Sequence, residues 1–187
     1  KWKVIQQHIS LPLDPKTLDA IIDAPIQPRK VTWSANPLAA PSATKAQGDE
    51  EIRTFMDVGG ASVGLDALMG YYGPGDDLLV YDSFNPRALI GKQEVRDHYA
   101  AVMGSYKGIK LSMPNFAVDS DGSFGVQIDT QDLTLTMNDG SIKNIALRQS
   151  DCMRRIGGKW YSFFEMISYP VDMKTNKGVM DGPGAAH

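Results

Sequence analysis

Residues 148–172, RQSDCMRRIGGKWYSFFEMISYPVD, decide the fold of this chain. Two runs of alternating side chains meet at Gly157 and Gly158, and a glycine pair supplies the positive φ angles of a tight hairpin turn. The second run, residues 160–169, is rich in apolar side chains at both odd and even positions. A strand with two apolar faces needs cover on both sides. We therefore expect a β-hairpin whose exposed face is covered in a homodimer or larger assembly.

The chain ahead of this hairpin carries alternating helix and strand signals. Helical patterns occupy two segments before residue 73, with Gly59 and Gly60 as the expected break between them, and a third segment after Gly91. Strand patterns occupy residues 78–84, 109–119, 124–137 and 142–155. The order is helix, helix, strand, helix and then four antiparallel strands, which predicts an α+β fold.

Two of these strands carry irregularities. Pro114 lies inside one strand, so that position is expected at a sheet edge or in a bulge. In the next strand the apolar side chains change from even positions, such as Ile128, to odd positions, such as Leu133. One extra residue near 130–132 would reconcile the two halves, and a β-bulge is expected there.

Four motifs carry a resemblance to a known family. They are YYGPGDDLLVYDSF (residues 71–84), GKQEVRDHY (91–99), SYKGI (105–109) and the ending GKW followed by S-x-P-x-D (158–172). In this order they resemble SnoaL-like proteins of the nuclear transport factor two-like (NTF2-like) superfamily, which also holds ketosteroid isomerase. The resemblance implies a cone-shaped, curved antiparallel sheet packed on three N-terminal helices, with a pocket between sheet and helices.

The N-terminus resembles the C-terminus of the same chain. Residues 2–25 align without gaps on residues 160–183. Nine positions are identical: Trp2/Trp160, Ile9/Ile167, Ser10/Ser168, Pro12/Pro170, Asp14/Asp172, Lys16/Lys174, Thr17/Thr175, Asp23/Asp181 and Pro25/Pro183. Such self-similarity indicates a repeated structural unit. We expect residues 1–25 to be the strand and tail that end a preceding SnoaL-like domain, with residues 4–11 paired to a sheet edge.

The remaining boundaries follow from composition. Residues 26–48 are rich in proline and alanine and are expected to form a linker. The SnoaL-like domain is expected over residues 49–176, and residues 177–187 form a C-terminal tail.

Composition excludes several classes of partner. The formal net charge of -3 argues against a nucleic-acid partner. No apolar run is long enough for a membrane span, and the chain is expected to be soluble, either cytoplasmic or exported with its signal removed. A single cysteine, scattered histidines and the lack of a phosphate-binding glycine loop predict neither a metal site nor a cofactor.

Carboxylates are the candidate catalytic groups. Resemblance to ketosteroid isomerase places Asp82 at the position of the general base and Asp151 near that of the second, protonated aspartate. The oxyanion tyrosine falls near Phe55, which has no hydroxyl, so a neighbouring tyrosine would have to replace it. Two structural roles remain open: Asp82 bonding backbone N–H groups in a turn, and Asp151 pairing with an arginine.

The expected pocket lining combines aromatic, methionine and carboxylate side chains: Phe55, Met69, Tyr72, Tyr99, Met153, Phe164, Glu165 and Met166. Similar proteins often carry H-E-H in the last strand, where this chain keeps only Glu165. Two functions are weighed. The first is a non-catalytic domain that binds a small apolar or polycyclic molecule or serves in assembly. The second is a cofactor-independent isomerase, cyclase or lyase with Asp82 as base.

Overall fold

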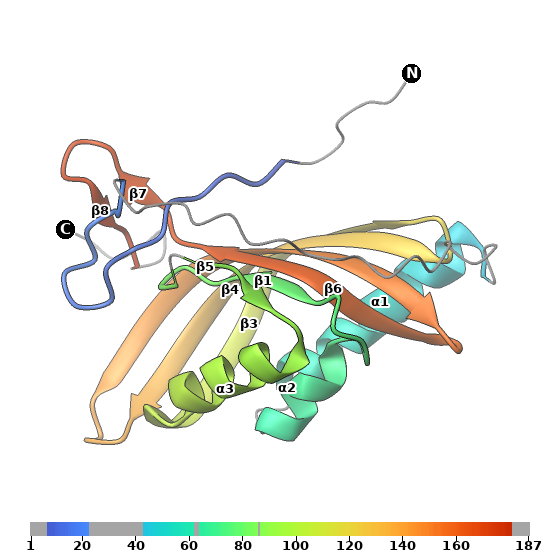
Figure 1. Cartoon of the computed structure of the whole chain (residues 1–187), viewed down its shortest axis with the longest axis horizontal. Coiled ribbons are helices and arrows are strands. Elements are labelled where there is room, and N and C mark those ends of the chain that lie inside the picture. Colours follow the sequence, from blue (N-terminus) through green and yellow to red (C-terminus); the bar gives the residue numbers. More distant parts are fainter. Residues whose placement is uncertain (1–6, 23–42, 62–63, 86, 181–187) are drawn as a thin grey trace.

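The computed structural model describes residues 7–22, 43–61, 64–85 and 87–180 (Figure 1). Its elements confirm the α+β prediction. The helices are α1 (Lys45–Ala61), α2 (Leu65–Tyr71) and α3 (Lys92–Met103). The strands are β1 (Leu79–Tyr81), β2 (Leu89–Ile90), β3 (Tyr106–Ser120), β4 (Phe124–Met137), β5 (Ile142–Ile156), β6 (Lys159–Ser168), β7 (Val171–Asp172) and β8 (Lys177–Gly178).

Helix α1 differs from its expected limits. It begins at Lys45, inside the stretch expected as linker, and it continues through Gly59 and Gly60 to Ala61. The glycine pair lowers helix propensity by about 1 kcal/mol per residue, yet the helix does not end there. Burial of Ile52 and Met56 against the sheet outweighs that local cost.

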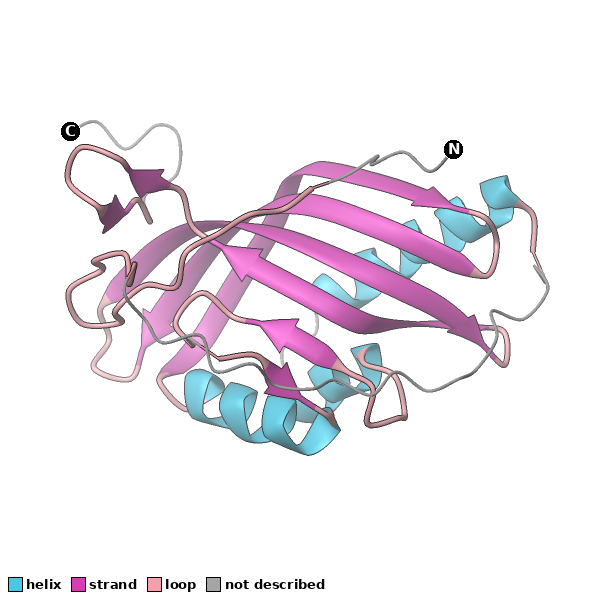
Figure 2. Ribbon diagram, turned by 45° about the horizontal axis from the view of Figure 1, so that its top comes forward, coloured by secondary structure: helices cyan, strands magenta, loops and turns pink. Residues whose placement is uncertain are grey.

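A six-stranded sheet forms the body of the molecule, in the order β2-β1-β6-β5-β4-β3. Strand β1 runs parallel to β6, and the other neighbours are antiparallel. The sheet curves around the three helices, which all lie on one side of it (Figures 1 and 2). We call this side the inner face and the opposite side the outer face. The main core lies between the inner face and the helices, with Tyr72, Val80 and Val95 fully buried.

The bulge expected near residues 130–132 lies in the partner strand instead. Strand β4 pairs with β5 without interruption, whereas β3 inserts one residue between Ser112 and Asn115 opposite Asp132 and Thr130. Pro114 falls in this bulge on the last strand of the sheet, as expected for a residue without a backbone N–H. The apolar phase change in β4 therefore has another cause: polar side chains occupy its inner face.

The N-terminal segment crosses the outer face rather than joining a sheet edge (Figure 2). Residues 7–11 form no strand, and residues 4–6 lie outside the described part of the chain. The His8 ring hydrogen-bonds Ser150 Oγ at 2.8 Å and Ser168 Oγ at 2.6 Å, both on the outer face. Leu13 is fully buried in a second apolar cluster with Leu147 and Tyr169. Trp2, whose match to Trp160 supported the repeat, also lies outside the described residues.

Candidate functional site

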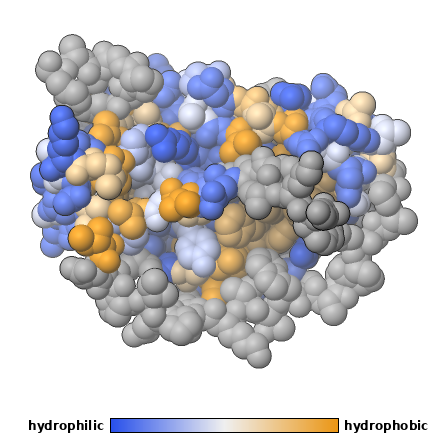
Figure 3. Space-filling model, turned by 90° about the horizontal axis from the view of Figure 1, so that it is seen from above, coloured by the Kyte–Doolittle hydropathy of each residue, from blue (hydrophilic) through white to orange (hydrophobic). Residues whose placement is uncertain are grey.

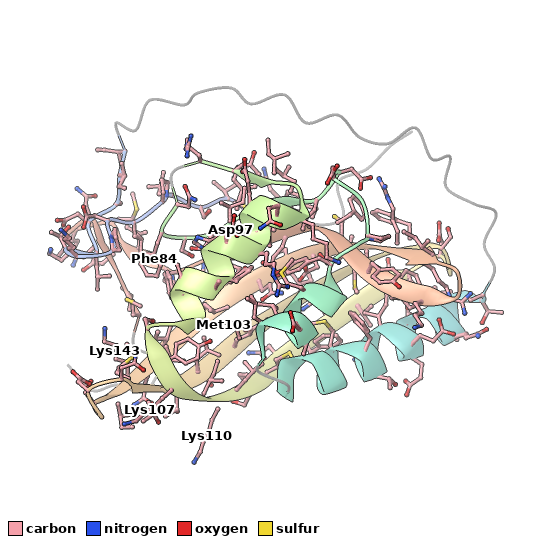
Figure 4. All side chains as sticks on the ribbon, turned by 60° about the horizontal axis from the view of Figure 1, so that its bottom comes forward. Phe84, Asp97, Met103, Lys107, Lys110 and Lys143 are labelled. Carbon is pink, nitrogen blue, oxygen red and sulfur yellow. The ribbon has the colours of Figure 1, made fainter. Side chains whose placement is uncertain are left out.

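A cavity of about 1120 Å³ lies on the inner face of the sheet. Its walls are largely apolar and come from β3, β4, β5 and β6: Ile109, Leu111, Leu133, Leu135, Ile145, Leu147 and Ile167. Figure 4 labels three residues of its lining, Phe84 after β1, Met103 at the end of α3 and Lys143 in β5. Residues of the N-terminal segment and of the β7–β8 region complete the lining.

The polar part of this cavity is centred on Glu165. The Tyr72 and Tyr99 hydroxyls both donate to Glu165 Oε1, at 2.9 and 2.5 Å. Their rings stack with centroids 6.2 Å apart and an interplanar angle of 12°. Tyr72 directly follows α2, Tyr99 lies on α3 and Glu165 on β6, so packing of helices on the sheet assembles this group.

Amide and hydroxyl side chains link Glu165 to Asp151. Gln149 Nε2 lies 3.2 Å from Glu165 Oε2 and 2.7 Å from Asp151 Oδ2. Ser162 Oγ donates to the other Asp151 oxygen at 2.7 Å, and Gln131 Nε2 donates to Gln149 Oε1 at 2.7 Å. We call this network the inner polar cluster, formed by Tyr72, Tyr99, Gln131, Gln149, Asp151, Ser162 and Glu165.

Burial controls the protonation of these carboxyl groups. Desolvation raises the pKa of Glu165 well above its usual value, and the nearby Asp151 charge raises it further. Desolvation also raises the pKa of Asp151. On the inner face of β4, burial and then the Asp151 charge raise the pKa of Asp129 to about 7. Two or more buried carboxylates this close do not all ionise readily, so the cluster holds protons near neutral pH.

The tyrosines are held as neutral donors. Burial is the largest cause that raises the pKa of Tyr72 and of Tyr99 well above the ordinary value, and the Glu165 charge is the next. A neutral phenol beside a buried acid can donate a hydrogen bond to a polar group of a ligand or to a developing negative charge.

Asp82 lies directly after β1 and lines the same cavity. Its Oδ1 accepts the Phe84 backbone N–H at 2.9 Å, while its Oδ2 lies 3.4 Å from His98 Nε2 on α3. The turn role weighed from the sequence is therefore present. The Asp82 charge is a smaller cause that raises the pKa of Glu165, which lies on the adjacent strand β6.

The structure separates the other expected site residues. Asp151 bonds Ser162 and Gln149 rather than an arginine, and Arg154 pairs with Asp77 at 3.0 Å.

Met69 and Met153 are buried in the main core, with Phe55 packed against it, and none of the three lines the cavity. Phe164 and Met166 lie on the outer face, because neighbouring residues of a strand point to opposite sides and Glu165 points inward. Phe164 contacts the Tyr81 ring there.

Sequence reasoning missed the glutamines and Asp129. Gln127, Asp129 and Gln131 follow each other on the inner face of β4, and Gln149 faces the same side from β5. Their signal was present as an unbroken series of odd positions from 125 to 135. It was overlooked because an inner face is expected to be apolar.

Two features are absent from the described residues: a cluster of metal ligands and a membrane-spanning helix. No group of three or more histidine, cysteine, aspartate or glutamate side chains in residues 7–22, 43–61, 64–85 and 87–180 is placed to hold a metal ion. None of the helices described is long and apolar enough to cross a membrane.

Comparison with known proteins identifies the family. The SnoaL-like domain model matches residues 61–172. No curated protein matches the chain. An NTF2-like protein of unknown function from Pseudomonas putida KT2440 is similar, with a TM-score of 0.65 and 21% identity over 75% of this chain and 99% of that one. An NTF2-like superfamily protein from Salmonella enterica gives a TM-score of 0.57 and 14% identity over 79% of this chain and 100% of its own. With the motifs and the helix-packed curved sheet, the family match shows that this chain belongs to the SnoaL-like family of the NTF2-like superfamily.

Proposed function

We propose that this domain binds a small, mostly apolar molecule in the inner cavity, with one polar group of the molecule against the inner polar cluster. The observation that carries the proposal is the division of the cavity into apolar walls and one hydrogen-bonding group at Glu165. Ligand pockets are typically apolar with a few polar groups that fix orientation. A volume of about 1120 Å³ accommodates a polycyclic molecule.

The polar cluster favours a ligand with a carbonyl or hydroxyl group at one end. Glu165 carries a raised pKa and two neutral tyrosine donors, so a proton is available at the inner end of the cavity. An anionic ligand group would lie next to buried Glu165, in the same cavity as Asp82, and would be disfavoured. The proposed ligand is therefore neutral at the end that enters first.

Nile red, a neutral polycyclic dye, provides a direct test of binding. Leu133→Trp fills the cavity from the inner face of β4, and Ile128→Trp adds the same bulk on the outer face of that strand. We expect the first change to weaken dye binding by at least about tenfold and the second to leave it unchanged. Equal dye affinity in both variants would place the binding site elsewhere.

Proton transfer is the second candidate function, and the presence of Asp82 and the Glu165 group in one cavity favours it. A carboxylate base and neutral hydrogen-bond donors in one cavity are the groups used to move a proton next to a carbonyl group. Asp82→Asn should lower turnover of a polycyclic ketone substrate about 10²–10⁴-fold. Asp97→Asn on the exposed side of α3 is the matched control. An unchanged rate in Asp82→Asn would exclude this carboxylate as the base.

Assembly through the outer face forms the third part of the proposal. Tyr81 and Ile128 are 43% and 36% exposed on this face, and it shows apolar patches in the space-filling view (Figure 3). The sequence predicts a homodimer through this face, and a second domain of different sequence is the competing occupant. Sedimentation of the chain at micromolar concentration tests it, and a monomer would contradict it.

A further inference from the structure

Two hairpins at opposite ends of the chain have the same backbone structure. The arm hairpin, residues 12–21, pairs Leu13 with Ala20. The terminal hairpin, residues 170–179, pairs Val171 with Gly178. Each residue of the first hairpin corresponds to the residue 158 positions later in the second. This offset is the one that aligns the N-terminal and C-terminal sequences.

Matched hydrogen bonds support the correspondence. Leu18 N–H donates to Asp14 O at 2.8 Å, and Asn176 N–H donates to Asp172 O at 2.8 Å. The closing bonds also match: Ile21 N–H to Pro12 O at 2.8 Å and Val179 N–H to Pro170 O at 2.7 Å.

The turn conformations match as well. Leu18 and Asn176 have φ angles of 61° and 54°, and they are the two non-glycine residues with positive φ in the described chain. A leucine rarely adopts this conformation, so its presence at the matching position indicates one structural unit used twice.

The two hairpins also pair with each other in a two-fold manner. Ala20 N–H donates to Asn176 O at 2.7 Å, and Gly178 N–H donates to Leu18 O at 2.7 Å. Ala20 corresponds to Gly178 and Leu18 to Asn176, so interchanging the two hairpins turns each of these bonds into the other. The residues between them, Asp19 and Lys177, face each other and correspond to each other. A pseudo-two-fold axis therefore passes between Asp19 and Lys177, which form an ion pair at 3.0 Å.

We propose that the outer face and the terminal hairpin are the docking surface for a second, non-identical SnoaL-like domain, whose C-terminal end is the arm hairpin. Residues 7–10 correspond to residues 165–168, which are the last four residues of β6. They lie on the outer face, where His8 bonds Ser150 and Ser168. Residues 7–10 would therefore be the end of the last strand of the second domain. The sheet of that domain would then lie over the outer face of this one.

The outer face has the composition that such a partner requires. Its strip of apolar side chains spans the central strands: Tyr81, Val126, Ile128, Cys152, Phe164 and Met166. By the pseudo-symmetry, Met166 of this domain corresponds to His8 and would lie over the sheet of the second domain. The two sheets then pack through their outer faces.

The axis residues explain why the partner is a different domain. In a two-fold dimer of identical domains, Lys177 would face a second Lys177, and like charges directly opposite are destabilising. The arm places Asp19 at this position instead. Moreover, the arm already occupies the place that the terminal hairpin of another copy would take.

A fused chain tests the proposal. Residues 43–158 are joined ahead of Lys1, because Lys1 and Trp2 correspond to Lys159 and Trp160, so that residues 1–21 complete a second domain. Cys152→Ser is introduced both in the original domain and in the added segment, which carries its own copy of this cysteine. Ile128→Cys is introduced in the original domain alone, so that the fused chain has one thiol, on the outer face of that domain. We expect the fused chain to sediment as a compact monomer and its thiol to react at least about tenfold more slowly than in the unfused chain.

Several outcomes would overturn the proposal. One is equal thiol reactivity in a fused chain whose added segment resists protease. Another is slow thiol reaction in the unfused chain together with sedimentation as a homodimer, which would make a second copy of the chain the occupant. Asp19→Lys in the fused chain is the control, because two lysines at the axis should restore thiol reactivity.

A second measurement does not depend on folding of the fused chain. The coding sequence upstream of Lys1 is expected to encode a SnoaL-like domain that ends in residues 1–21. An unrelated upstream sequence would overturn the proposal.

Discussion

Strand β4 carries Gln127, Asp129 and Gln131 in succession on its inner face, whereas its outer face carries Val126 and Ile128. The buried side of the strand is thus polar at its centre, and the more exposed side is apolar. Burying carboxyl groups raises their pKa and costs free energy. Buried carboxyl groups with raised pKa values are typical of functional sites. An apolar strip that is exposed in the isolated domain is typical of a surface that binds a partner. The contrast supports the proposed ligand site on one face and the proposed docking surface on the other.

Gln149→Leu should give the largest effect on this contrast. Gln149 contacts Asp151, Glu165 and Gln131, and its loss leaves two buried carboxyl groups short of a donor. We expect the free energy of unfolding at pH 8 to fall by about 3–5 kcal/mol, measured by urea denaturation. The neighbouring outer-face change Arg148→Leu should alter it by about 0.5 kcal/mol or less. Equal losses in both variants would show that the two faces do not differ in this way.

The pH dependence of stability provides a second, smaller effect. In the folded protein Asp129 has a pKa of about 7, above the usual aspartate value of 3.8. The folded state therefore binds a proton that the unfolded state releases, so this contribution is complete below pH ~4 and is lost as pH rises through about 7. Asp129→Asn removes the titration and should stabilise the protein at pH 8 by on the order of 2 kcal/mol. Thermal melting at pH 5 and pH 8 measures the difference.

Asp132, exposed on the same strand, supplies the control for this prediction. Asp132→Asn should leave the difference in melting temperature between pH 5 and pH 8 as it is in the unsubstituted protein. If Asp129→Asn has the same pH dependence as the unsubstituted protein, then Asp129 titrates as an ordinary exposed carboxylate.

Ile128→Thr should give the smallest effect. Ile128 lies on the outer face and is 36% exposed, so its truncation should change the free energy of unfolding of this chain by about 0.5 kcal/mol or less. Leu135→Thr, on the buried inner face, should cost about 2 kcal/mol. In the fused two-domain chain the Ile128 change should become more costly. An unchanged cost there would show that the outer face stays uncovered.

The order of elements was predictable because it depends on local patterns. Gly157 and Gly158 mark the hairpin, Pro114 marks the edge strand, and the helical stripe of Val95 and Tyr99 marks α3. The polar inner face was not predictable by the rule that apolar side chains point inward. By that rule Ile128 was expected on the inner face. A bulge in β4 was then expected, to reconcile the apolar even positions of its first half with the apolar odd positions of its second half.

The site was predictable only in part for the same reason. Asp82 and Glu165 lie at the cavity, where sequence reasoning placed them. The partners of Glu165 come from α2 and α3, far along the chain, and no local pattern reports that Tyr72 and Tyr99 both reach one carboxylate oxygen. Phe164 and Met166 were misplaced because β6 is apolar on both sides, so alternation alone does not say which side faces the helices.

The bulge at Pro114 has a consequence for the behaviour of the protein at high concentration. Strand β3 ends the six-stranded sheet, and an edge strand offers unpaired backbone groups to any other extended chain. Pro114 supplies no N–H there, and the inserted residue breaks the even spacing that a continuous ladder needs. Strands from neighbouring molecules therefore cannot extend the sheet along its full length, which protects this long edge from growth into fibrils.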